Sequence, residues 1–313
     1  MAPTPARRPR TVLMAGASGF LGSHLARHLR HRGDTVRRLV RRPAQESEEV
    51  TWDPGDGELP EHVLRDVDVV VNLGGVGIGD KRWTAEYKAE VIRSRTAGTS
   101  VLAEALAREA DRRSTVGASA PRLLQASAVG YYGDRGAEVL TEESPAGEGF
   151  LPEVCLQWEA ATAPAESAGV GVVHLRTGIV LAPGGGALGP LLPLIKAGLG
   201  GPLGGGEQWW PWITLADTVR VQLHLMDSAL TGPVNVAGPQ AAQQGDVIRA
   251  IARALRRPAL LPVPGLAMRL ALGDFADDVL SSQLVVPARL LADGFVFTQP
   301  TARAAADWVA ERA

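Results

Sequence analysis

The sequence has few of the residues that build disulfides, metal sites and nucleic-acid surfaces. Its 313 residues include one cysteine, Cys155, so an internal disulfide and a cysteine-built zinc site are both excluded. Lys+Arg and Asp+Glu number 32 and 34, and this formal net charge of −2 argues against bulk binding of nucleic acid. No apolar run reaches the ~18–20 residues that cross a bilayer. We therefore expect no metal centre, no nucleic-acid partner, no membrane span and a cytoplasmic location.

Short apolar runs alternate with helical patterns through much of the chain. Runs that are apolar almost throughout indicate strands buried on both faces, as in a parallel sheet with helices on each side. We therefore predict an α/β fold with a Rossmann-type, doubly wound parallel sheet. The predicted strands are Thr11–Ala15, Thr35–Val40, Val67–Leu73, Arg122–Ala126, Gly171–Arg176 and Pro233–Ala237, and the predicted helices are Leu21–Arg32, Ala85–Ala110, Leu215–Ala229 and Asp246–Leu255.

The composition changes after the fifth predicted strand. Glycine runs punctuate residues 183–210, which predicts long loops in place of packed helices. We expect residues 1–10 to be a loose leader and residues 11–182 to form a nucleotide-binding domain, with its sheet completed by about 232–238. Residues 183–313 are then mostly a smaller, substrate-facing lobe.

A glycine-rich turn joins the first predicted strand to the first predicted helix. One glycine allows the tight turn, a second lets the backbone approach a diphosphate, and a third lets the helix pack closely on the strand. The start of the helix then offers free N–H groups to the phosphates. The turn predicts a dinucleotide site that uses Gly16, Ser18, Gly19, Phe20, Leu21 and Gly22.

The end of the second predicted strand favours NADP over NAD. An NAD site usually has an acidic residue near this point, whereas this strand ends in Arg41-Arg42 with no carboxylate before Glu46. A guanidinium can donate two hydrogen bonds to a 2′-phosphate, which a carboxylate would repel. The alternative is a general preference for arginine, because only three of the 32 basic residues are lysines.

Together these motifs resemble the extended short-chain dehydrogenase/reductase superfamily, and within it an atypical branch of NAD(P)-dependent "epimerase family proteins". The tail from about Leu261 to Phe297 is similar to that branch's C-terminal domain of unknown function, which we place at about 261–310. The matching segments are Gly16-Ala-Ser-Gly-Phe-Leu-Gly, Asn72-Leu-Gly-Gly, Lys81-Arg-Trp, Ser94-Arg95, Ser127-Ala-Val-Gly-Tyr-Tyr-Gly, Trp158-Glu-Ala-Ala, Leu175-Arg-Thr-Gly-Ile-Val-Leu, Gly200-Gly-Pro-Leu-Gly, Trp212-Ile and Gly232-Pro-Val-Asn.

The resemblance implies NADP as the cofactor and specific residues that contact it. Two of these residues, Glu90 and Arg95, would lie on one helix, where Arg95 could reach a phosphate while Glu90 orients it. They equally fit a solvent-facing ion pair. The positions that match the family's NADP contacts are Arg41, Arg42, Leu73, Gly74, Glu90, Arg95 and Val180.

The usual catalytic pair of the superfamily is missing from this chain. Its redox members generally use a tyrosine and a lysine four residues later, and the lysine lowers the tyrosine pKa. None of the three tyrosines has such a lysine, and the lysine position falls near Glu159. Ser127 and Tyr131, at the carboxyl end of a predicted strand, are therefore our predicted catalytic residues. Cys155 and Glu159 are an alternative acid and base, and Arg176 either holds an anionic substrate or caps loop carbonyls.

Two functions from different classes follow from these motifs. The first is an NADP(H)-binding oxidoreductase or epimerase-like enzyme that acts on an unidentified small molecule. The second is a non-catalytic NADP(H) sensor or regulator, which the absent Tyr/Lys pair favours. A structural subunit without cofactor is a third option, and a homodimer is one assembly that the sequence leaves open.

Overall fold

The fold contains a seven-stranded sheet with the strand order of a Rossmann fold. The structure is a computed structural model that describes residues 8–55, 57–259 and 262–313, so residues 1–7 of the predicted leader lie outside the described residues. The chain order of the strands reverses between β1 and β4, and the strand pairs with a defined register are parallel. In spatial order the strands are β12 (Gly232–Val236), β7 (Val172–Thr177), β5 (Arg122–Ala128), β4 (Val69–Asn72), β1 (Thr11–Ala15), β2 (Thr35–Val40) and β3 (Glu49–Thr51).

This sheet confirms the predicted α/β, Rossmann-type fold class. Contacts within the chain divide it into two compact units, which interleave along the sequence. The first unit comprises the residues up to 74 together with 97–125 and 161–172, and the second comprises 75–96, 126–160 and 173–313. The predicted domain limits at 182 and 183 stay a prediction.

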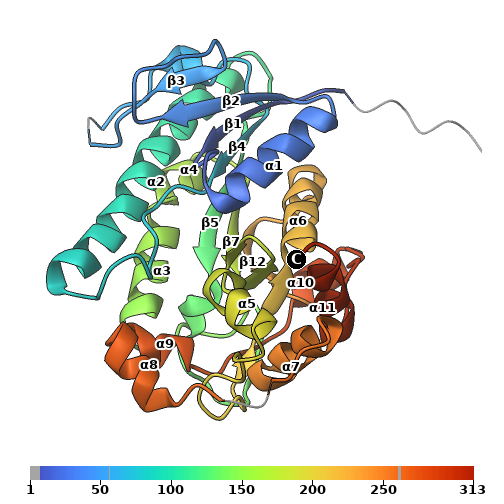
Figure 1. The fold of residues 1–313 in the computed structure, drawn as a ribbon. Helices are drawn as coiled ribbons and strands as arrows, with labels where there is room; N and C mark the ends of the chain where they lie inside the picture. The colour runs from blue at the N-terminus through green and yellow to red at the C-terminus, as the bar shows by residue number, and fades with distance from the viewer. Residues whose placement is uncertain (1–7, 56, 260–261) are drawn as a thin grey trace, which may run out of the picture. The chain divides into compact units, whose positions relative to one another are not determined.

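The first unit has its core around β1 and β4. Apolar side chains of both strands are buried, because each strand has a neighbour on either side in the sheet. Helix α1 (Phe20–His31) lies beside the first strands (Figure 1) and buries one face, formed by Gly22, Leu25, Ala26 and Leu29. The other elements that lie wholly or partly in this unit are η1 (Glu61–Val63), α2 (Ala85–Ser114) and α4 (Ala163–Ser167).

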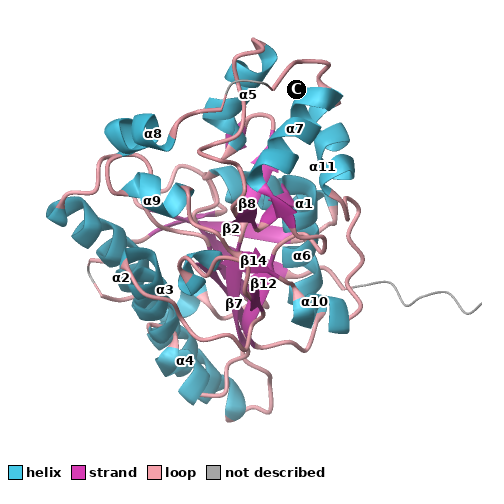
Figure 2. Ribbon diagram, turned by 90° about the horizontal axis from the view of Figure 1, so that it is seen from below, coloured by secondary structure: helices cyan, strands magenta, loops and turns pink. Residues whose placement is uncertain are grey.

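The second unit contains short strands and several helices. Helix α7 (Gln244–Ala254) packs along α11 (Ala302–Ala310) in both views (Figures 1 and 2) and shares an apolar cluster with Trp210 and Trp212. The strand pairs are β8–β11, β8–β9, β10–β13 and β6–β14. These short strands are β6 (Val139–Leu140), β8 (Ile179–Ala182), β9 (Gly185–Gly186), β10 (Trp209–Trp210), β11 (Trp212–Thr214), β13 (Ala242–Gln243) and β14 (Leu284–Val285).

The glycine-rich segment contains a helix that the sequence analysis did not predict. Residues 183–210 were expected to be loops, but α5 (Leu188–Lys196) forms there and buries Leu188, Leu192 and Ile195. Their spacing is helical, and the flanking glycines concealed it. The remaining elements of the second unit are η2 (Val129–Tyr132), α3 (Phe150–Ala160), α6 (Leu215–Asp227), α8 (Gly265–Leu272), α9 (Phe275–Val279) and α10 (Ala288–Ala292). No helix in the described part of the chain is long and apolar enough to cross a membrane.

Candidate functional site

The turn after β1 requires glycine at two of its predicted positions. Gly16 has a φ of +73°, and a Cβ there would lie 2.7 Å from the backbone of Leu73. At Gly22 a Cβ would lie 2.1 Å from the Gly16 carbonyl oxygen. Side chains are therefore excluded where the turn, the helix and the end of β4 meet, as close approach of a dinucleotide backbone requires.

The start of α1 leaves hydrogen-bond donors for a ligand. Gly19 caps the helix without any side-chain hydrogen bond, and no acidic residue lies in the first turn. The first N–H groups of a helix have no acceptor within the helix, and the helix dipole is positive at this end. Ser18 and Gly19 are exposed, and Phe20 and Leu21 are half-buried. This donor set fits the diphosphate of a dinucleotide.

A buried amide network holds the turn after β4 in place. The Asn72 side-chain oxygen accepts a hydrogen bond from the Gly74 N–H at 3.1 Å, and its amide nitrogen donates to Thr99 and Gln125. Leu73 donates its N–H to the Ala15 carbonyl on β1. Leu73 and Gly74, two of the predicted NADP contacts, thus lie directly beside Gly16.

The two arginines after β2 differ sharply in their surroundings. Arg42 donates to both carboxylate oxygens of Glu49, at 2.8 and 2.6 Å. Arg41 is exposed and makes no hydrogen bond or ion pair with the described residues. Hydrogen bonding to Arg42 lowers the pKa of Glu49 to about 2, with help from the Gln45 N–H. Sequence reasoning missed Glu49, whose side chain is fully buried.

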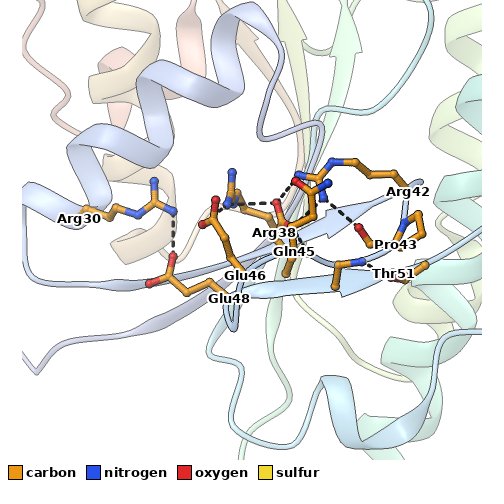
Figure 3. A network of polar contacts seen from close by, with 10 residues as sticks. Arg30, Arg38, Arg42, Pro43, Gln45, Glu46, Glu48 and Thr51 are labelled. Carbon is orange, nitrogen blue, oxygen red and sulfur yellow. Dashed lines mark hydrogen bonds and ion pairs between the residues drawn. The ribbon is translucent and has the colours of Figure 1, made fainter.

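The carboxylates of the β2–β3 turn, and Glu49 at the start of β3, all have arginine partners. Besides Arg42, Glu49 pairs with Arg38 at 3.1 Å, and Arg38 also binds Glu46 at 2.6 Å. Glu48 pairs with Arg30 at 2.9 Å (Figure 3). The turn therefore presents no unpaired negative charge among its described residues, and Arg41 is its one unpaired cation.

In the second unit, Ser127 lies at the end of β5 and donates a hydrogen bond to Glu159 of α3. The distance from Ser127 Oγ to Glu159 Oε1 is 2.6 Å, and the serine is 4% exposed. Arg176 on β7 binds both oxygens of Glu159, each at 2.9 Å. Arg176 therefore has a carboxylate of this chain as its bidentate partner, and its Nη1 also donates to the Glu142 carbonyl at 3.5 Å. Its contact with a substrate anion stays a prediction.

The two tyrosines of η2 surround the same guanidinium. Arg176 Cζ lies 3.4 Å from the centroid of the Tyr131 ring, and Arg176 Nη1 donates to the Tyr132 hydroxyl at 3.1 Å. The Tyr132 hydroxyl donates in turn to Asn235 at 2.7 Å. Burial raises the pKa of Tyr132, so this phenol stays protonated. Tyr131 is only half-buried, which leaves it the more accessible of the two.

Cys155 is unsuited to the role of catalytic thiolate. Burial, followed by the nearby Glu159 carboxylate, raises its pKa to about 12. Its thiol donates to the Ala128 carbonyl at 3.6 Å. A thiol in this state stays protonated and resembles a small buried apolar group. The alternative that pairs Cys155 with Glu159 as acid and base stays a prediction.

The remaining predicted NADP contacts also lie in the second unit. Glu90 pairs with Lys81 at 3.5 Å on the exposed side of α2. Arg95 donates to the Val91 carbonyl and stacks over the Trp158 ring, and burial lowers its pKa. Val180 is buried on β8 and pairs with Ile213. Their contact with a cofactor stays a prediction.

Comparison with known proteins establishes the family. A model of the NAD dependent epimerase/dehydratase family matches residues 12–238. The chain belongs to the NAD-dependent epimerase/dehydratase family. A domain of unknown function, DUF1731, matches residues 263–309 of this epimerase-family chain. Both findings confirm the resemblance described from the sequence motifs.

Relatives of this epimerase-family chain match it over nearly its whole length. An epimerase family protein of Mycobacterium bovis is 43% identical over 292 residues, which cover 93% of this chain and 94% of the relative. The crystal structure of human epimerase family protein SDR39U1 with NADPH has a TM-score of 0.85 at 31% identity, over 97% of this chain and 100% of that one. A nucleoside-diphosphate sugar epimerase of Corynebacterium glutamicum has a TM-score of 0.76 at 33% identity, over 97% of this chain and 58% of that one.

Proposed function

We propose that this chain binds NADP(H) and acts as an NADP(H)-dependent oxidoreductase or epimerase-like enzyme on a small molecule. The observation that carries the choice of cofactor is the charge distribution after β2. Each carboxylate there is paired with an arginine, while the exposed Arg41 has no partner among the described residues. An unpaired guanidinium at this point attracts a 2′-phosphate.

The glycine turn and the similarity to SDR39U1 support the same cofactor. The N-terminus of α1 supplies donors for a diphosphate, and Gly16 and Gly22 keep side chains away from it. Human SDR39U1, which matches 97% of this chain, was crystallised with NADPH. When bound, the cofactor would supply or accept a hydride.

Within the second unit, Ser127 and Glu159 have the geometry of a proton relay. Because Ser127 donates its own proton to Glu159 at 2.6 Å, its oxygen can accept a hydrogen bond from a substrate hydroxyl. In alcohol oxidation the substrate proton passes to Ser127 Oγ while the serine proton passes to Glu159. Arg176 acts as a positioning residue that fixes both oxygens of Glu159. Tyr131, whose ring stacks on Arg176, is the more accessible of the two phenols.

Titration calorimetry with the two reduced cofactors tests the cofactor proposal. We expect NADPH to bind at least about tenfold more tightly than NADH, because only NADPH presents a phosphate to Arg41. Equal affinities would remove the argument for NADP.

A reaction screen tests the enzymatic part of the proposal. Wild-type protein is incubated with NADPH and a panel of carbonyl compounds and nucleotide sugars, and NADPH oxidation is followed. S127A and E159Q should each abolish any turnover found, while NADPH still binds. A protein that binds NADPH but oxidises it with no member of the panel contradicts the enzyme proposal.

One observation favours a non-catalytic NADP(H) sensor as the second candidate. Ser127 and Arg176 both donate to Glu159, so this carboxylate already has partners within the chain, and the chain has no Tyr-x-x-x-Lys sequence. A sensor would bind partner proteins differently with NADPH and with NADP⁺. Identical pull-downs in both states argue against it.

We extend the proposal to a cytoplasmic location and to a homodimer as the assembly. Fractionation of cells tests the first, and light scattering of the purified protein tests the second.

A further inference from the structure

Glu49 is a fully buried carboxylate at the edge of the predicted 2′-phosphate site. Its two oxygens bind Arg42 at 2.6 and 2.8 Å, and one of them lies 3.1 Å from Arg38. Its Oε2 also accepts the Gln45 N–H at 2.8 Å. A carboxylate that receives this many charge-assisted bonds has one fixed orientation.

The segment that contains Arg42 is tied to β3 by these contacts (Figure 3). Beside the Gln45 bond, the Ala44 N–H donates to Thr51 Oγ1 at 2.8 Å, and Arg42 Nη1 donates to the Pro43 carbonyl at 3.0 Å. Glu49 and Thr51 are both β3 residues. The backbone from Arg42 to Gln45 is therefore held against β3 by side-chain hydrogen bonds.

The geometry leaves one edge of the Arg42 guanidinium available. Glu49 occupies its end through Nη1 and Nη2, while Nε has no acceptor among the residues that the structure describes. The Arg42 side chain is 46% exposed. One guanidinium can bind a carboxylate with one edge and a phosphate with another, and a pre-oriented guanidinium loses less side-chain freedom when it binds.

We propose that Glu49 is a positioning residue for cofactor selection, which holds Arg42 so that its free edge meets the 2′-phosphate of NADP(H). This inference rests on the proposed binding of NADP(H). Arg41 supplies the unpaired charge, and Glu49 fixes the orientation of Arg42. Glu49 itself is buried behind Arg42 and does not contact the phosphate.

The test compares E49Q with E48Q by titration calorimetry with NADPH and NADH. The two changes remove one negative charge each from adjacent positions, but Glu48 pairs with Arg30 and does not contact Arg42. We expect E49Q to weaken NADPH binding about tenfold and to leave NADH within about twofold of wild type. E48Q should leave the affinities for NADPH and NADH within about twofold of the wild-type values.

R42Q and the double variant E49Q/R42Q complete the test. R42Q should cause the same selective loss of NADPH, and the double variant should lose no more than R42Q alone, because Glu49 acts through Arg42. Additive losses overturn the inference. So does an E49Q variant that binds NADPH as tightly as wild type, or one that loses NADH and NADPH equally and so has only a structural defect.

The design separates this inference from the proposed function. A wild-type protein that binds neither cofactor refutes the proposed function itself. A wild-type protein that prefers NADPH, together with an E49Q variant that keeps the preference, refutes the role of Glu49 alone.

Discussion

Arg41 and Arg42 follow one another in the chain, yet they contribute differently to the proposed cofactor site. Arg42 shares its charge with Glu49, whereas Arg41 is exposed and unpaired among the described residues. We expect R41Q to weaken NADPH binding by about tenfold or more, since it removes the only unpaired cation of the turn. NADH affinity should change by less than about twofold. Calorimetry with both cofactors measures this, and equal losses would contradict it.

At Cys155, burial predicts a chemically inert thiol. The pKa of about 12 leaves almost no thiolate at neutral pH, and the side chain is 3% exposed. We expect alkylation by iodoacetamide near pH 8 to be very slow in the folded protein and fast in urea. Mass spectrometry over time measures both rates. Rapid labelling of the native protein would show that the thiol is accessible.

Residue identities predicted the glycine turn and the arginine pair, because both follow from backbone sterics and charge at fixed spacing. Contacts between side chains that lie far apart in the sequence were harder to predict. Glu159 and Arg176 lie 17 positions apart on a helix and a strand, so only the fold shows that they form a pair. Glu49 was missed because a glutamate in an acidic stretch gives no sign that it will be buried between two arginines.

Among the elements, α1 depends on a close approach to the turn that precedes it. In G22A the new methyl group would lie 2.1 Å from the Gly16 carbonyl, so the helix must move away from β1. We expect the free energy of unfolding to fall by about 1–3 kcal/mol and cofactor binding to be lost. Urea denaturation and calorimetry measure the two effects.

G189A in α5 is the matched control for G22A. A Cβ at Gly189 meets nothing within 4 Å, so the same chemical change should leave stability equal or raise it by up to about 1 kcal/mol. A G22A variant as stable as G189A would show that the turn does not need this glycine.

For the protein as a whole, two carboxylates shift stability with pH in opposite directions. The pKa of Glu49 is lowered to about 2, mainly by its bonds with Arg42. Its contribution to the free energy of unfolding is therefore complete above about pH 4.5 and is lost as the pH falls toward 2. Burial, then the neighbouring Asp277, raises the pKa of Asp278 to about 6. Ionised Asp278 therefore destabilises the fold as the pH rises from about 4 through 6.

D278N isolates the second of these effects. We expect the variant and wild type to be equally stable near pH 4, where Asp278 is protonated in the folded protein. Above about pH 6 the variant should be more stable than wild type. Thermal unfolding across this pH range measures the difference. A variant less stable than wild type near pH 8 would mean that the Asp278 charge is favourably paired.

The salt bridge of Glu159 with Arg176 restricts how this chain could acquire the tyrosine–lysine chemistry of its superfamily. Converting position 159 to lysine would set an ammonium group against a guanidinium that is 4% exposed, and two enclosed like charges repel strongly. Arg176 would have to change at the same time, and Tyr132 would then lose a hydrogen-bond donor. The single substitution E159K is therefore expected to destabilise the fold, and a lysine at this position would require a simultaneous change of Arg176.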